Sequence, residues 1–185
     1  EAGARLRSAL DWPENLGEGK LPGARENHVH LALGLALRSL GRSGEAERFL
    51  RAAAAGSGGP ASAMFYNDEP PDMVFYRGLA LRALGRTAEA RAVFRSLADY
   101  ARRHRNDAVE IDYFAVSLPD FLVFEDDPRR RHAAHAAWMS GLGRLGLGDR
   151  RGARRAFAAV RRFDAAHPGL ILPQAMVDIV GGSGV

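Results

Sequence analysis

The 185-residue sequence contains no cysteine, only two tryptophans and a single lysine, Lys20. Without cysteine the chain has no disulfide, no thiolate metal ligand and no cysteine nucleophile. It also has no apolar run approaching the roughly 18 residues of a membrane-spanning helix. These absences exclude disulfide-stabilised and thiol-dependent proteins, and they give no reason to expect a membrane partner.

Neither positive nor negative charge dominates the chain. It has 26 basic and 22 acidic residues, which gives a formal net charge of +4. The most basic stretch, residues 150–162, has no ladder of aromatic side chains on which bases could stack, so we do not expect a nucleic-acid partner. The N-terminus, Glu1-Ala2-Gly3, has no signal-peptide pattern. The compartment is undetermined, with the cytoplasm favoured.

Three segments of the chain follow one pattern, and they cover residues 28–54, 72–98 and 135–161. Each has a glycine, then a Leu-Gly pair, then an alanine and finally a large apolar residue, all at fixed offsets. In order, these positions are Gly34, Gly41, Ala46 and Leu50; Gly78, Gly85, Ala90 and Phe94; and Gly141, Gly148, Ala153 and Phe157. We interpret each segment as two antiparallel helices joined by a tight turn.

These offsets have a physical reason. Small residues in both helices allow a close approach, and the large residue lies on the same face as the alanine and fills the contact. The glycine after leucine can adopt the left-handed conformation that ends the first helix. A single hairpin would leave one apolar face exposed. The sequence therefore predicts an all-α fold in which hairpins stack as a superhelical solenoid.

The repeats do not fill the chain evenly, although we expect residues 1–185 to form one helical domain. Two ordered loop insertions, residues 56–71 and 103–131, are predicted between successive repeats. Residues 2–11 match the second half of a truncated repeat, so the chain is expected to start within the array. Residues 167–180 are expected to form a short C-terminal helix that covers the last hairpin.

The repeated pattern resembles the tetratricopeptide repeat, and Arg144 departs from it because a large apolar residue is usual at that position. The strings at residues 14–20, 67–86 and 111–127 are more specific. They are similar to the C-terminal tetratricopeptide region of large, uncharacterised bacterial proteins. In those proteins a β-rich domain of unknown function, suspected of acting on carbohydrate, comes first. The resemblance implies that this chain docks against such a preceding domain.

A ligand surface is expected on the concave face of such an array, which the first helix of each pair lines. A mixture of aromatic, arginine and histidine side chains suits a peptide or polar ligand. The candidate residues on this face are His28, Arg38, Phe75, Arg82, His135 and Trp138. The second interpretation, which we favour for the large side chains of this face, is that they simply pack against the next repeat.

Three stretches interpreted as loops combine aromatic residues with carboxylates and amides. Long loops in compact domains are usually functional or disordered, and these are too aromatic for disorder. Aromatic rings can stack on sugar C–H faces while carboxylates accept hydroxyl hydrogens, so carbohydrate is a further candidate partner. The candidate loop residues are Trp12, Glu18, Tyr66, Asn67, Asp68, Asp72, Tyr113 and Asp120.

Signals for catalysis or metal binding are weak. Pairs of acidic residues could suggest a glycosidase, but no spacing places two carboxylates across a cleft, and Asp126-Asp127-Pro128 is typical of a helix start. His132 and His135 could share a helix face, but their spacing indicates no third ligand. We expect no catalytic residue, no metal site and no cofactor.

The leading hypothesis is a non-catalytic scaffold for protein–protein or interdomain interaction that docks a preceding β-rich, carbohydrate-related domain. One alternative is a free-standing adaptor that holds a peptide in the concave groove. A less favoured alternative is a carbohydrate-active enzyme that uses loop carboxylates. An open groove through His28, Phe75 and Trp138 would favour the adaptor. Two loop carboxylates about 5–10 Å apart in a pocket would favour the enzyme.

Overall fold

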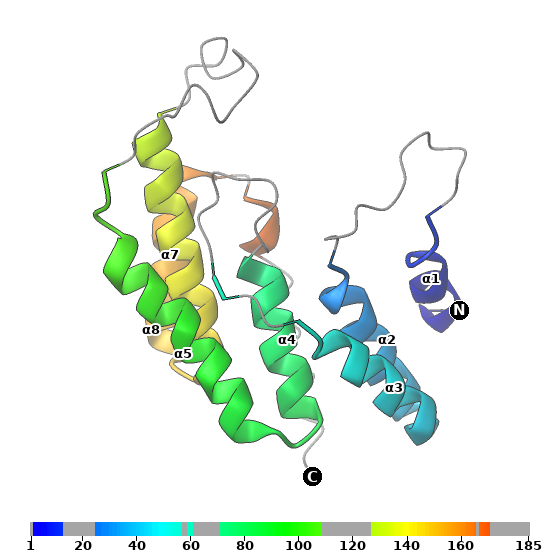
Figure 1. The fold of residues 1–185 in the computed structure, drawn as a ribbon. Coiled ribbons are helices and arrows are strands. Elements are labelled where there is room, and N and C mark those ends of the chain that lie inside the picture. The colour runs from blue at the N-terminus through cyan, green and yellow to red at the C-terminus, as the bar shows by residue number, and fades with distance from the viewer. Residues whose placement is uncertain are drawn as a thin grey trace.

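The helices pair in the order in which they occur along the chain (Figure 1). The computed structural model describes residues 2–12, 25–56, 59–60, 71–108, 127–165 and 167–170. Within these ranges every regular element is helical, which confirms the all-α prediction for the described residues. The elements are α1 (Ala2–Ser8), α2 (Asn27–Ser39), α3 (Ser43–Ala53), α4 (Pro71–Ala83), α5 (Thr87–His104), α7 (Pro128–Gly146), α8 (Arg150–Phe163) and the 3-10 helix η2 (Pro168–Leu170).

Three antiparallel pairs, α2–α3, α4–α5 and α7–α8, correspond to the three repeated segments. Helix α4 also contacts α2 and α3, and α7 contacts α4 and α5, so each pair packs on the pair before it. Helix α1 packs on α2 at the other side of the first pair. No helix in the described ranges has both the length and the hydropathy needed to cross a membrane.

Each pair reverses direction at a glycine with a left-handed backbone. The φ angles of Gly41, Gly85 and Gly148 are 75°, 78° and 89°. After each glycine, the next residue donates its backbone N–H to a carbonyl five residues back, as Arg42 does to Leu37 at 3.0 Å. This bond satisfies a carbonyl that the helix end would otherwise leave unpaired. The predicted left-handed glycine is confirmed at all three turns.

The predicted contact between a glycine and a large residue recurs in each pair. The contacts are Gly34 with Leu50, Gly78 with Phe94, and Gly141 with Phe157. A Cβ added at Gly34 would lie only 2.8 Å from Cγ of Leu50, and the equivalent atoms at the other two glycines would meet a phenylalanine ring. The absence of a side chain is therefore what allows the two helices of each pair to approach.

Successive pairs are joined by arginines at equivalent positions. Arg38 follows the first glycine by four residues, and its guanidinium donates to the carbonyl oxygen of Ala83 at 3.0 Å. Arg82 stands at the same position of the second pair and donates to the carbonyl oxygen of Gly146. Ala83 and Gly146 are themselves equivalent, since each follows its own repeat glycine by five residues. The two bonds thus repeat one geometry between neighbouring pairs, and Leu145 occupies the arginine position in the third.

Helices α5 and α7 approach closely at two further glycines. A Cβ added at Gly143 would lie 2.7 Å from the backbone N of Ala98 and 2.7 Å from the carbonyl oxygen of Phe94. A Cβ added at Gly146 would meet the Phe94 ring. These glycines therefore set the distance between the second and third pairs, in addition to the repeat glycines that act within a pair.

The main core extends through all three pairs, since Leu31 of α2 and Leu50 of α3 belong to it. Phe75, Leu79 and Phe94 are each 0% exposed, and they belong to one buried cluster with Trp138 and Leu142. A second, smaller cluster lies beside α1. It consists of Leu33, Leu37 and Ala46, with Leu6, Leu10 and Phe49 packed against it. Helix α1 therefore covers one apolar side of the first pair.

Two aspartates begin the helices of the third pair. Asp127 precedes Pro128 and accepts a hydrogen bond from the backbone N of Arg129 at 2.9 Å, as a helix start at this position predicts. Asp149 accepts from the backbone N of Gly152 at 2.8 Å and pairs with Arg144 at 2.8 Å. The bond from Gly152 and then that from Arg144 lower the pKa of Asp149.

The helix bounds differ in places from the repeat boundaries. Helix α5 continues to His104 and α7 already begins at Pro128, so both ends of the predicted insertion 103–131 are helical. Within the predicted insertion 56–71, residues 57–58 and 61–70 lie outside the described residues. Of the predicted C-terminal helix 167–180, the described residues include only η2 and the residue before it.

Candidate functional site

Of the loop residues predicted to bind a partner, Trp12 and Asp72 are described. Trp12 is 47% exposed, and its Nε1 donates to the Glu26 carboxylate at 2.7 Å. Asp72 does not lie in a loop as predicted: it is the second residue of α4, since Pro71 starts that helix and a carboxylate is favourable in a first turn. The other six predicted residues, Glu18, Tyr66, Asn67, Asp68, Tyr113 and Asp120, lie outside the described residues.

The aromatic residues predicted for the concave face are buried. Phe75 is 0% exposed and packs against Phe94, with ring centroids 5.7 Å apart. Trp138 is 4% exposed, and its ring centroid lies 5.3 Å from that of Phe157. Neither ring is part of an open groove. The packing interpretation therefore replaces the binding interpretation for these two residues. Neighbouring helices cover both rings, and the His167 ring also lies 4.6 Å from that of Trp138.

The arginines predicted for this face are engaged within the fold. Arg38 and Arg82 form the bonds between successive pairs described above. The Arg82 guanidinium also lies 4.9 Å from the centre of the Phe94 ring, and the face of an aromatic ring attracts a cation placed above it. Burial, followed by repulsion from Arg91, lowers the pKa of Arg82. Both side chains hold helices together, and neither is free to project into a groove.

The structure brings His28 and Asp72 to the same tyrosine, at the N-terminal ends of α2 and α4. The His28 ring lies 5.9 Å from the Tyr76 ring, and its Nδ1 is 3.3 Å from Sδ of Met73. Tyr76 is 4% exposed. His135 is partly exposed on α7, one helical turn before the buried Trp138. Of the predicted concave face, both histidines and both arginines are thus partly exposed, and both arginines form bonds to the following helix pair.

Burial, with a smaller contribution from the negative charge of Asp72, raises the pKa of Tyr76 from 10.0 to about 12. The unfolded chain releases this proton near pH 10, whereas the folded chain retains it to about pH 12. The contribution to stability is therefore complete below pH 10 and is lost as the pH rises toward 12, by up to roughly 1.4 kcal/mol per pH unit.

Tyr76→Phe removes the titrating group, so the variant should lack this loss. Urea unfolding of both proteins between about pH 8 and pH 11.5 measures it. The difference in unfolding free energy, wild type minus variant, should stay constant up to about pH 10 and then fall. A difference that stays constant over the whole range would show that Tyr76 ionises as it does in the unfolded chain.

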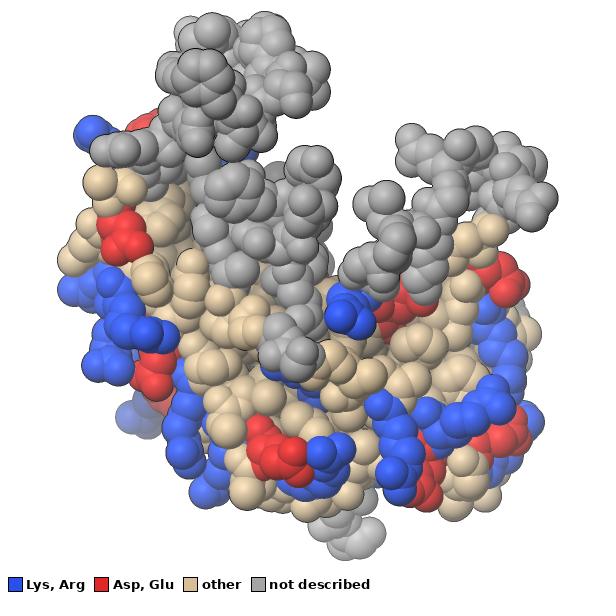
Figure 2. Space-filling view, viewed as in Figure 1, with Lys and Arg blue, Asp and Glu red and all other residues tan. Residues whose placement is uncertain are grey.

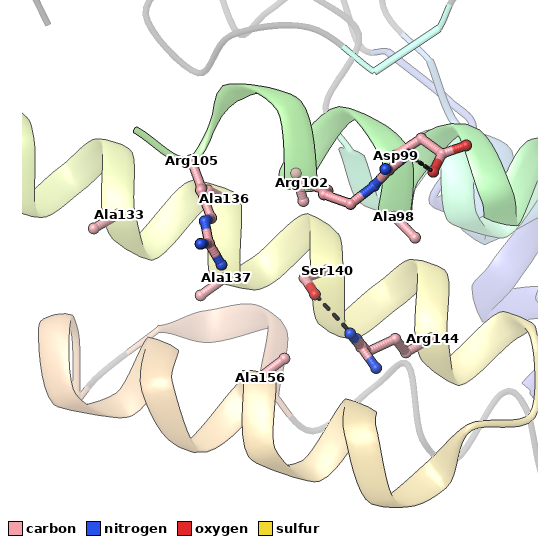
Figure 3. A pocket seen from close by; sticks show the side chains of 11 residues that line it. Ala98, Asp99, Arg102, Arg105, Ala133, Ala136, Ala137, Ser140, Arg144 and Ala156 are labelled. Carbon is pink, nitrogen blue, oxygen red and sulfur yellow. Dashed lines mark hydrogen bonds and ion pairs between the residues drawn. The ribbon is translucent and has the colours of Figure 1, made fainter. Parts of the chain in front are cut away.

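A groove that the sequence did not predict lies between α5, α7 and α8 (Figure 3). Its volume is about 540 Å³, and alanines from all three helices line it together with arginines and Asp99. The signal in the sequence was the run of alanines in α7, at positions 133, 136 and 137, whose spacing places small side chains on one helix face. Alanine is also common where helices pack together, so the spacing alone could not show whether this face lines a groove or contacts another helix.

Among the described residues, no group of three or more histidine, aspartate or glutamate side chains is arranged to hold a metal ion. No family model matches the chain. No solved structure matches it either.

Proposed function

We propose that the chain is a helical-repeat scaffold of the tetratricopeptide type that mediates protein–protein or interdomain interaction. The observation that carries the proposal is the recurrence of the same contacts at the same offsets. Each repeat glycine lies against the large residue of its partner helix. Arg38 and Arg82 donate to equivalent carbonyls of the following pair. Arrays in which each unit contacts only its neighbours present extended binding surfaces.

The proposed partner is the preceding β-rich, carbohydrate-related domain that the resemblance implies. Trp12 supports this part of the proposal because its ring is 47% exposed while its indole nitrogen is held by Glu26. An aromatic side chain held in this way can bury a large apolar area on docking while losing little conformational freedom. The burial of Phe75 and Trp138 counts against the free-standing adaptor with an open concave groove. A carbohydrate-active enzyme keeps the least support.

Calorimetric titration of the chain with the separately produced preceding domain tests the proposal. Trp12→Ala should weaken the interaction about tenfold or more, as expected for an aromatic residue at the centre of an interface. Leu40→Ala is the matched control. Leu40 is 69% exposed and follows the C-terminal end of α2. Trp12 lies at the opposite end of that helix, where it is bonded to Glu26, the residue before α2.

A screen of peptides and sugars against the chain and against the longer polypeptide completes the test. Sugar binding that requires the longer polypeptide supports docking. Tight peptide binding by the chain alone, with no affinity for the preceding domain, contradicts docking and favours the adaptor. Equal effects of Trp12→Ala and Leu40→Ala contradict the role given to Trp12.

A further inference from the structure

The groove between α5, α7 and α8 has a floor of small side chains. Helix α7 forms the floor with Ala133, Ala136 and Ala137, while Ala98 of α5 and Ala156 of α8 stand on either side. Figure 3 shows α7 running between the two flanking helices. Because alanine extends only one carbon from the backbone, a segment lying in the groove could bring its own backbone close to the floor.

Arginines surround this small-residue floor. Arg102 pairs with Asp99 at 2.8 Å, and Arg144 is held by Asp149 at 2.8 Å and by Ser140 at 3.3 Å. Arg105, just after the end of α5, is exposed, and in Figure 3 its side chain extends across the groove toward α7 without bonding to any of the side chains drawn. Its guanidinium is therefore placed to receive a carboxylate in a two-point contact.

The charge of the surrounding helices favours an acidic occupant. Residues 87–108 and 127–165, which contain α5, α7 and α8, include fifteen arginines and six carboxylates, a net charge of +9. The rest of the chain, with eleven basic and sixteen acidic residues, has a net charge of −5. Helix α8 contains six arginines and no acidic residue. Figure 2 shows basic side chains gathered along the edge of the molecule formed by α5. This separation of charge raises the local concentration of anionic partners near the groove.

We propose that this groove binds an acidic peptide segment of a partner protein. The floor of small side chains admits the peptide backbone. Arg105 and the surrounding arginines bind the carboxylates of the peptide, and the Asp99 carboxylate can accept a hydrogen bond from a peptide N–H group. Nucleic acid fits less well because none of the side chains that line the groove is aromatic, so bases have no ring on which to stack. The surface is separate from the one that contains Trp12, so the two proposals stand or fall independently.

Fluorescence anisotropy with a labelled peptide of about twelve residues, built from glutamate and alanine, tests the proposal. The same peptide with glutamine in place of glutamate should bind at least about tenfold more weakly, since charge-assisted bonds are lost. Arg105→Gln should weaken binding about fivefold, the scale of an exposed ion pair. Arg103→Gln is the matched control because Arg103 is exposed, lies at the end of the same helix and does not line the groove.

A steric pair of variants tests whether the groove itself is occupied. Ala156→Leu fills the space beside the floor and should reduce affinity about tenfold, whereas Ala158→Leu places the same side chain on an exposed face of α8 and should have no effect. Thermal melting of each variant shows whether it remains folded.

Three results would overturn the proposal. Equal weakening by Arg105→Gln and Arg103→Gln indicates nonspecific charge attraction. Unchanged affinity in a folded Ala156→Leu variant places the peptide elsewhere. Tighter binding of a labelled single-stranded thymidine oligonucleotide of about twelve nucleotides than of the acidic peptide, sensitive to Ala156→Leu, identifies a nucleic-acid groove instead.

Discussion

Phe94→Ala should lower the free energy of unfolding by about 3–5 kcal/mol, the cost of removing a buried aromatic ring and leaving a cavity. The Phe94 ring is 0% exposed and lies against Phe75 and the repeat glycine of α4. It also receives the Arg82 guanidinium on its face and fills the space over Gly146 of α7. One side chain therefore connects α4, α5 and α7, and neither neighbouring helix can collapse into the space without losing its own contacts.

Urea unfolding followed by circular dichroism and by tryptophan fluorescence, to which the buried Trp138 and the exposed Trp12 both contribute, measures this loss. Phe163→Ala is the control, because Phe163 is 37% exposed at the end of α8 and its truncation should cost about 1 kcal/mol or less. A loss below about 1.5 kcal/mol for Phe94→Ala, or similar losses for the two variants, contradicts the central position of Phe94. Separate transitions by the two probes would indicate that the pairs unfold one by one.

Gly143→Ala should lower the free energy of unfolding by about 1–3 kcal/mol, although alanine is the better helix former. The added Cβ would lie 2.7 Å from the backbone N of Ala98 and 2.7 Å from the carbonyl oxygen of Phe94. Both contacts are with backbone atoms of α5, so no side chain can rotate away. Helices α5 and α7 must separate instead, which weakens the packing between the second and third pairs.

The same substitution at Gly44 is the control. Gly44 lies in the first turn of α3, and an added Cβ there would meet nothing within 4 Å. Gly44→Ala should leave stability unchanged or raise it by up to about 1 kcal/mol, because alanine loses less backbone freedom on folding. Urea unfolding should therefore show a lower free energy of unfolding for Gly143→Ala and no decrease for Gly44→Ala. A stabilising effect at both positions would mean that α7 can move away from α5 at little cost.

The glycines illustrate how far sequence reasoning extends. The repeated offset from Gly78 to Phe94 predicted a contact within one hairpin, and the structure confirms it because both residues belong to one local unit. Gly143 has no equivalent glycine in the other segments, so its repeat position suggested no role. Its function depends on where α5 lies relative to α7, and that placement follows from the packing of one pair on another.

The candidate binding residues show the same division. The repeat alignment assigned Phe75 and Trp138 correctly to the first helices of their pairs, but whether their rings face solvent depends on what covers them. In the structure both rings are buried. The excess of arginine in the last third of the chain was also visible in the sequence. Its relation to an alanine-lined groove was not, because the groove is formed by three helices that are separated along the chain.

The sequence by itself determined the elements of this protein: three helical pairs, a left-handed glycine at each turn, and a glycine packed against a large residue within each pair. In each pair the glycine and the large residue are 16 positions apart, on either side of one short turn. The periodicity of each helix and the fixed length of the turn are therefore enough to relate them. Only the tertiary structure decided which faces are covered, how Arg38 and Arg82 link successive pairs, and that α5, α7 and α8 enclose a groove. Those properties depend on the placement of one helix pair against the next, which no local spacing specifies.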